Sequence, residues 1–202
     1  CLTNFPSYLG SPVHTDTSGS WARCRIAADS ALGTLTVDEI EGAETLRKEA
    51  EQRRGFAVTH VGEWVPGKKE MSAEDARDTL RMLHFWFGLL RGAWCGPVFA
   101  QGISEGEVAW RHYARWRLAE AKGQRSWLPH ATPVDLQNTF TGFVTRWKNP
   151  AWQGPLVSAI AWLVEANDTR ALESKIVLAQ VALELLAWVW LVETQQLHSR
   201  GD

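Results

Sequence analysis

Cysteine is scarce in this sequence, and the few cysteines lie far apart along the chain. Cys1, Cys24 and Cys95 are an odd number, and no two of them form a C-x-x-C motif. This excludes a disulfide framework and a cysteine-based zinc site. The chain also lacks the charged and then apolar leader of a signal peptide. We therefore predict a cytoplasmic protein, and we expect this sequence to be a piece of a longer polypeptide.

The usual motifs for metals and cofactors are missing as well. The six histidines include no H-E-x-x-H pair and no cluster with carboxylates or cysteines at metal spacing. Neither standard type of glycine-rich phosphate loop occurs. We predict no metal site and no cofactor. The net charge of −2 gives no general attraction to nucleic acid, so any such binding needs a local patch.

One short motif does match a catalytic pattern. Residues Gly102–Gly106 read G-x-S-x-G, the nucleophile elbow of many hydrolases, with Ser104 as the nucleophile. In that elbow a sharp strand-to-helix turn exposes the serine beside backbone N–H groups. Here the motif lies between two predicted strands, where glycine and serine are typical of a hairpin turn. A serine hydrolase is therefore the weakest of our functional hypotheses.

The most apolar stretch of the chain is Leu172–Glu193. Between Ile176 and Val192 only Gln180 and Glu184 are polar. Six apolar residues recur at steps of four and three, the spacing of one helical face: Leu172, Ile176, Ala179, Leu183, Leu186 and Trp190. A membrane span would place Glu184 near the middle of the bilayer, at a cost of a few kcal/mol. We predict instead an interior helix of a bundle and no membrane contact. We also expect the bundle to continue beyond Asp202 or to be completed by a second chain.

Periodicity and turn residues predict an α+β fold in which a β-rich region precedes an all-helical one. The order is a loop at 1–20, a β-rich domain with one amphipathic helix at 21–118, a linker at 119–131 and a helical region at 132–202. In the β-rich part we predict strands at Trp21–Ala28, Leu32–Val37, Gly55–Val65, Trp94–Ala100 and Glu107–Leu118. Helices are predicted at Ala43–Arg54 and from Ser72 to Arg91, and three more follow the linker.

The last predicted strand of the β-rich part carries a basic face. Residues alternate along Glu107–Leu118, and one side carries Arg111, Tyr113, Arg115 and Arg117. Arginines could hold a phosphate backbone while the tyrosine stacks on a base. The same pattern also fits the solvated side of an antiparallel strand. We take these four residues as a candidate nucleic-acid surface and assign no catalytic residue.

The helical part resembles a known family. The segments Trp162–Asn167, Leu172–Leu178 and Val181–Leu186 are similar to the opening helices of the large HEPN domains of ApeA-like bacterial proteins. The upstream region, including Thr59–Gly62 and Glu107–Trp110, resembles the β-rich region that precedes such domains. The resemblance implies a four-helix bundle that usually dimerises. Many HEPN domains are metal-independent ribonucleases of toxin, abortive-infection or antiphage systems.

The catalytic signature of that family is an arginine and a histidine with four to six residues between them, and Arg77 with His84 is one match to this spacing. By the resemblance it would lie beyond Asp202, so we place it on no residue of this chain. Our first hypothesis is thus the sensing or scaffolding N-terminal part of a bacterial HEPN-type defence protein, inert as a fragment. RNA or a phage component is a possible partner, and the C-terminal helices are expected to form a homo-oligomer. The alternative is a non-catalytic module that binds a ligand and dimerises.

Overall fold

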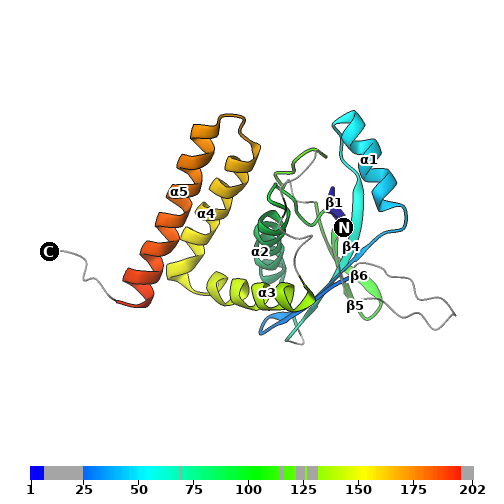
Figure 1. The fold of residues 1–202 in the computed structure, drawn as a ribbon. Coiled ribbons are helices and arrows are strands. Elements are labelled where there is room, and N and C mark those ends of the chain that lie inside the picture. The colour runs from blue at the N-terminus through cyan, green and yellow to red at the C-terminus, as the bar shows by residue number, and fades with distance from the viewer. Residues whose placement is uncertain (7–24, 69, 114–115, 122–125, 127–131, 197–202) are drawn as a thin grey trace.

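The computed structural model of the chain describes residues 1–6, 25–68, 70–113, 116–121, 126 and 132–196. A four-stranded sheet, two helices against one of its faces and a helical hairpin beyond them form successive layers (Figure 1). The elements in chain order are β1 (Leu2–Thr3), β2 (Arg25–Ser30), β3 (Gly33–Glu39), α1 (Ala43–Arg53), β4 (Val58–Pro66), α2 (Ala73–Arg91), β5 (Ala100–Ser104), β6 (Glu107–His112), α3 (Pro133–Trp147), α4 (Pro150–Asp168), α5 (Leu172–Trp188) and the π-helical turn η2 (Val189–Thr194). The predicted α+β class, β-rich first and helical later, is confirmed.

The main sheet is antiparallel with the order β1-β4-β3-β2. Alternate residues of β2 and β3 point to the helices, and Ile26, Ala28, Leu35 and Val37 are almost fully buried. This is the period-two pattern of strands that bury one face. The opposite face of these two strands is polar or exposed.

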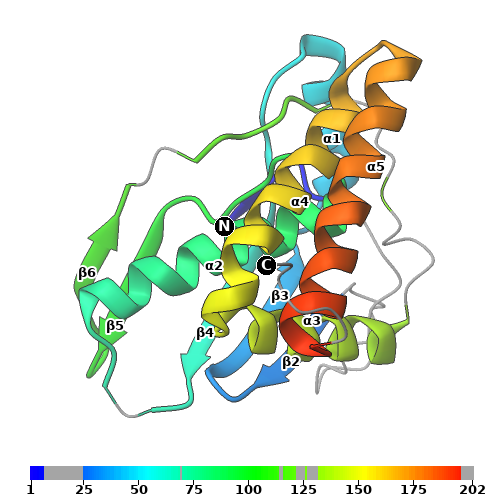
Figure 2. The same cartoon turned by 90° about the vertical axis from the view of Figure 1, so that its left-hand side faces the viewer.

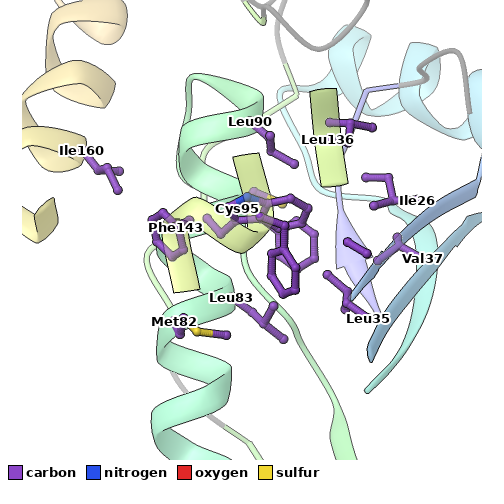
Figure 3. Close-up of a cluster of buried hydrophobic side chains, with 14 of the residues drawn as sticks. Ile26, Leu35, Val37, Met82, Leu83, Leu90, Cys95, Leu136, Phe143 and Ile160 are labelled. Atoms are coloured by element: carbon purple, nitrogen blue, oxygen red, sulfur yellow. The ribbon is translucent and has the colours of Figure 1, made fainter. Parts of the chain in front are cut away.

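Helix α2 lies across the buried face of the sheet. Its start is fixed by a capping box, because Ser72 accepts from the N–H of Asp75 and Asp75 accepts from the N–H of Ser72. Gly92 ends it with φ at 69°, a left-handed conformation that glycine adopts at little cost. Side chains of the strands, α2, α3 and α4 meet in one core (Figure 3). Trp86 at its centre has no exposed surface.

Helix α3 packs on the sheet rather than standing apart with the later helices. The side-chain amide of Gln137 accepts from the N–H of Asp29 and donates to its carbonyl, each at 2.8 Å. Thr141 Oγ1 donates to the same carbonyl at 3.2 Å. Buried side chains of α3, among them Phe140 and Trp147, belong to the common core. The described part of the chain therefore shows no break in packing between the β-rich region and α3.

Helices α4 and α5 form an antiparallel hairpin at the edge of the molecule (Figures 1 and 2). Asn149 caps α4 by accepting from the N–H of Ala151, and Pro150 occupies the first turn, where no N–H partner is needed. Helix α4 contacts α2 and α3 on one side and α5 on the other. Helix α5 has its main contacts with α4 and η2. The hairpin is thus anchored to the body through α4.

Several predicted boundaries differ from the structure. Residues 1–6 belong to the sheet and core instead of a loop, with β1 paired to β4 and Phe5 fully buried; residues 7–20 lie outside the described residues. The predicted strand Trp94–Ala100 is wrong, because β5 begins only at Ala100. Residues 94–96 are instead buried against α2 without strand pairing. Strand β6 ends at His112, six residues before the predicted end at Leu118.

Candidate functional site

Strands β5 and β6 form a separate two-stranded hairpin at one end of α2, on the opposite side of the molecule from α5 (Figure 2). The connection is two residues, Glu105 and Gly106, with φ at 52° and 86°. Positive φ at both positions is the geometry of a tight hairpin turn whose twist matches that of the strands. The hairpin has two different faces because successive residues point to opposite sides.

The outer face of the hairpin presents two aromatic side chains and an arginine to solvent. Gln101 pairs with Arg111 across the strands, and Phe99 and Tyr113 lie one step beyond the end of the ladder. Phe99 is 61% exposed and Tyr113 is 76% exposed. Together with Ala100 these residues line a shallow depression of about 290 Å³. We call Phe99, Gln101, Arg111 and Tyr113 the hairpin face.

The inner face of the hairpin continues into a column of stacked rings. The ring of Trp110 stacks on His112 at 5.3 Å between centroids, and His112 contacts Trp116 at 6.2 Å. His84 of α2 is enclosed between Trp116 at 4.8 Å and Trp94 at 5.1 Å. Offset stacking of this kind stabilises aromatic pairs beyond the burial of their surface. The column fixes the hairpin to α2 and so positions the hairpin face.

Burial lowers the pKa of His84 to about 4, and a hydrogen bond with the backbone of Cys95 partly opposes this shift. The imidazole is only 5% exposed, so its charged form is poorly solvated. Gly96 lets the chain pass close to this ring, because a Cβ there would lie 2.5 Å from His84 Nδ1. His84 is therefore a neutral packing residue at pH 7. Arg77, which has a HEPN-like spacing from it, is exposed.

We expect the protein to lose stability when the pH falls from about 6.5 to about 4. The pKa of His84 is lowered in the folded state, and burial also lowers the pKa of His60 to about 3. The unfolded chain therefore binds more protons in this range, and acid favours unfolding by on the order of 2–3 kcal/mol per buried histidine. Urea unfolding at pH 7 and pH 4.5 measures the loss. The variant His84→Phe should lose clearly less stability over the same interval; an equal loss would contradict this assignment.

The four residues of the predicted nucleic-acid surface are not brought together. Arg111 and Tyr113 share the hairpin face, whereas Arg115 lies outside the described residues. Arg117 comes after the strand has ended, so the alternation no longer applies to it. Its guanidinium lies 3.4 Å from Glu165 of α4 and 5.7 Å from the ring centroid of Trp94. Arg117 therefore connects the segment after β6 to α4. Phe99, which the sequence analysis did not include, is part of the hairpin face instead.

Ser104 lies at the exposed end of β5, and β6 follows after the two-residue turn. A nucleophile elbow requires a helix directly after the serine, so the local geometry here is that of a hairpin. Among the described residues, no three histidine, cysteine, aspartate or glutamate side chains form a group that could hold a metal ion.

The second unusual surface is that of α5. The helix is apolar nearly all round, yet most of it is uncovered: Leu172 is 65% exposed, Ile176 58%, Val177 57% and Leu183 68%. Only Ala182 and Val189 are fully buried along the segment, both on the side of α4. Gln180 donates to Glu184 at 2.8 Å and forms an exposed polar stripe with it.

In length and composition, Leu172–Thr194 is the one helix within the described residues that could cross a membrane. The mean hydropathy of an 18-residue window within it is 1.9, and 11% of that window is buried. A single helix of this kind is weak evidence for a membrane protein.

The fold and these two surfaces define a class: a small α+β domain with an attached helical hairpin. The model of the YopA central domain matches residues 1–124, and that of the YopA C-terminal domain matches residues 149–202. The chain therefore belongs to the YopA family. The second match begins at the residue that caps α4, and α3 lies between the two matches.

Among curated proteins the chain is similar to the SPbeta prophage-derived uncharacterized protein YopA of Bacillus subtilis (strain 168). The two are 25% identical over 139 residues, which is 68% of this chain and 32% of the relative. The chain thus spans about a third of the length of that relative. No solved structure matches.

Proposed function

We propose that this chain is an assembly module that self-associates through α5. The observation that carries the proposal is the exposure of large apolar side chains along the whole of that helix, from Leu172 to Leu191. Contiguous apolar patches on soluble proteins mark interaction sites, because leaving them in water forgoes the free energy of burial. Among the described residues, large apolar side chains of the strands, α2, α3 and α4 are gathered in one buried core, in contrast to those of α5.

A protein partner suits this surface better than lipid does. Glu184 lies near the middle of the apolar segment and is exposed together with Gln180. In a bilayer this carboxylate would cost a few kcal/mol, whereas at the rim of a protein interface it stays in water. We therefore propose a cytoplasmic oligomer.

Sedimentation velocity of the 202-residue chain tests the proposal. Between about 1 and 100 µM we expect a dimer that dissociates on dilution, since affinities in this range are common for interfaces of standard size or smaller. A monomer at every concentration would overturn the proposal. Association only with added lipid vesicles would overturn it too and would favour membrane binding.

For the whole protein we propose the role implied by the HEPN resemblance, a bacterial antiphage or abortive-infection factor whose ribonuclease residues lie beyond Asp202. The self-association proposed above would fit this role, because HEPN signatures act when two copies meet. The prophage origin of the relative also fits a protein of phage–host conflict. An RNA-cleavage assay with this chain beside the longer protein is the test. Cleavage by the chain alone would contradict the proposal.

The hairpin face supports a second candidate function, binding of single-stranded nucleic acid. Two exposed aromatic rings beside an arginine are the parts of a stacking surface, and each stacked base contributes about 1–3 kcal/mol. Fluorescence anisotropy with a labelled oligouridylate measures the affinity. We expect Tyr113→Ala and Arg111→Ala each to weaken binding by roughly 5- to 100-fold. Arg77→Ala, at an exposed arginine of α2, is the matched control; equal binding by all variants would contradict this function.

A further inference from the structure

We infer that two copies of the chain pair through α5 in antiparallel orientation, along the seam formed by Ile176, Ala179, Leu183 and Leu186. The inference rests on the proposed self-association and specifies its partner, direction and register. Leu172 and Trp190 extend the seam at its two ends.

The seam is available for a partner. Ile176 is 58% and Leu183 is 68% exposed, Ala179 is exposed, and Leu186 is half-buried. At about 100° per residue, these side chains lie roughly a quarter of a turn from the face that Ala182 turns to α4. A helix with two such neighbouring apolar faces fits a four-helix bundle, in which each helix contacts two others. Helix α4 occupies one of these faces, and the other has no cover among the described residues.

The spacing of the seam fits an antiparallel copy of itself. Successive seam residues are separated by three, four and three positions, an order that reads the same from both ends. A two-fold axis at the level of Val181 then places Ala179 opposite Leu183 and Ile176 opposite Leu186. Both pairs are repeated by the symmetry, as an isologous interface requires. At the centre, alanine meets leucine, which allows the helices to approach to about 8–10 Å.

The charges of the segment favour the same direction. The half of α5 from Leu172 to Gln180 carries Glu173 and Lys175, which sum to 0. From Val181 to the end of η2 the chain carries Glu184 and Glu193, which sum to −2. Antiparallel pairing keeps the two negative halves apart, and it also opposes the two helix dipoles. Parallel pairing would place the two negative halves side by side.

Two hairpins joined in this way form a four-helix bundle of α4, α5 and their symmetry mates. Gln180 and Glu184 lie on the side of the seam away from α4, so they stay at the solvent-exposed rim. The body of each copy remains outside the bundle, because α4 connects the hairpin to it (Figure 1). The interface therefore needs no change in the described fold.

Disulfide cross-linking distinguishes the orientations. In a background with Cys1→Ser and Cys24→Ser, we prepare Ala179→Cys and Leu183→Cys separately, let the two exchange subunits and oxidise the mixture. Cys95 can stay, because it has no exposed surface and burial raises the pKa of its thiol to about 11, which keeps it unreactive. A covalent dimer is expected in the mixture and in neither variant alone. Val177→Cys mixed with Leu183→Cys is the control and should give none, since Val177 lies off the seam.

The outcomes test the antiparallel register separately from self-association through α5. Cross-linking of either single variant with itself would show parallel pairing and overturn the inference. A non-covalent dimer without cross-links in the mixture would overturn the register while self-association stands. A monomer before oxidation would overturn both.

Discussion

Replacing Leu183 with glutamate should convert the dimer into a monomer. Leu183 lies at the centre of the seam and is 68% exposed in the single chain, so the change leaves the folded monomer nearly undisturbed. In the dimer it removes two buried leucines, each contributing about 1.5–3 kcal/mol, and it desolvates two carboxylates without a partner. The dissociation constant should rise by at least about 1,000-fold. Sedimentation velocity gives the measurement.

Val177→Glu is the matched control for this experiment. Val177 is on the same helix and is 57% exposed, but it faces away from the seam. We expect this variant to dimerise like the parent chain. Far-UV circular dichroism and the melting temperature of both variants report whether the fold is intact. A Leu183→Glu protein that still dimerises, or equal effects of the two changes, would contradict the seam.

Replacing Arg91 with leucine should cause the largest loss of stability. Arg91 has no exposed surface, and its guanidinium donates to the carbonyls of Trp94 at 2.8 Å, Glu120 at 3.1 Å and Ala119 at 3.4 Å. It thereby joins the end of α2 to the segment that follows β6. Leucine removes all of these hydrogen bonds from a charged donor, although Trp94 still accepts from the N–H of Ala119 and Ala119 from the side chain of Asn4. Their loss should cost about 3–5 kcal/mol. For a chain of this size the melting temperature should fall by roughly 6–20 °C.

Two further variants define the cause of that loss. Arg91→Lys keeps the charge but not the planar fork that reaches several carbonyls, so it should recover only part of the stability. Arg77→Leu removes an exposed arginine from the same helix and should change stability by less than about 0.5 kcal/mol. If Arg91→Leu melts within a few degrees of the parent protein, these hydrogen bonds are not what joins the two segments.

The sequence predicted elements best where local chemistry decides their ends. Ser72 and Asp75 form the capping box of α2, and Thr132 with Asp135 does the same for α3, as their residue types indicate. The apolar segment at Trp94 was misassigned because its burial comes from a distant partner, the ring of His84, and not from strand pairing. Nothing in the local pattern distinguishes these two causes of burial.

The candidate surfaces show the same limit. The predicted nucleic-acid surface included Arg117 because residues alternate along a strand, but β6 ends at His112. The position of Arg117 depends instead on its contact with Glu165, which lies 48 residues further along the chain. Phe99 joins the hairpin face only through the register of β5 and β6, which the sequence does not reveal. For α5 the sequence did indicate an apolar helix with too few partners, and the described residues leave it uncovered on one side.

The hydrogen bonds of Gln137 to Asp29 have a consequence for how copies of the protein can meet. Strand β2 is at the margin of the sheet, where free backbone groups invite another strand to add. The amide of Gln137 already occupies both backbone groups of Asp29, so a strand from a neighbouring molecule finds no donor or acceptor at that residue. The addition of strand after strand from further molecules, which would build a fibre, is therefore less favourable at β2. The two-fold pairing that we propose for α5 would lie at the helical end instead, and it would stop at two copies.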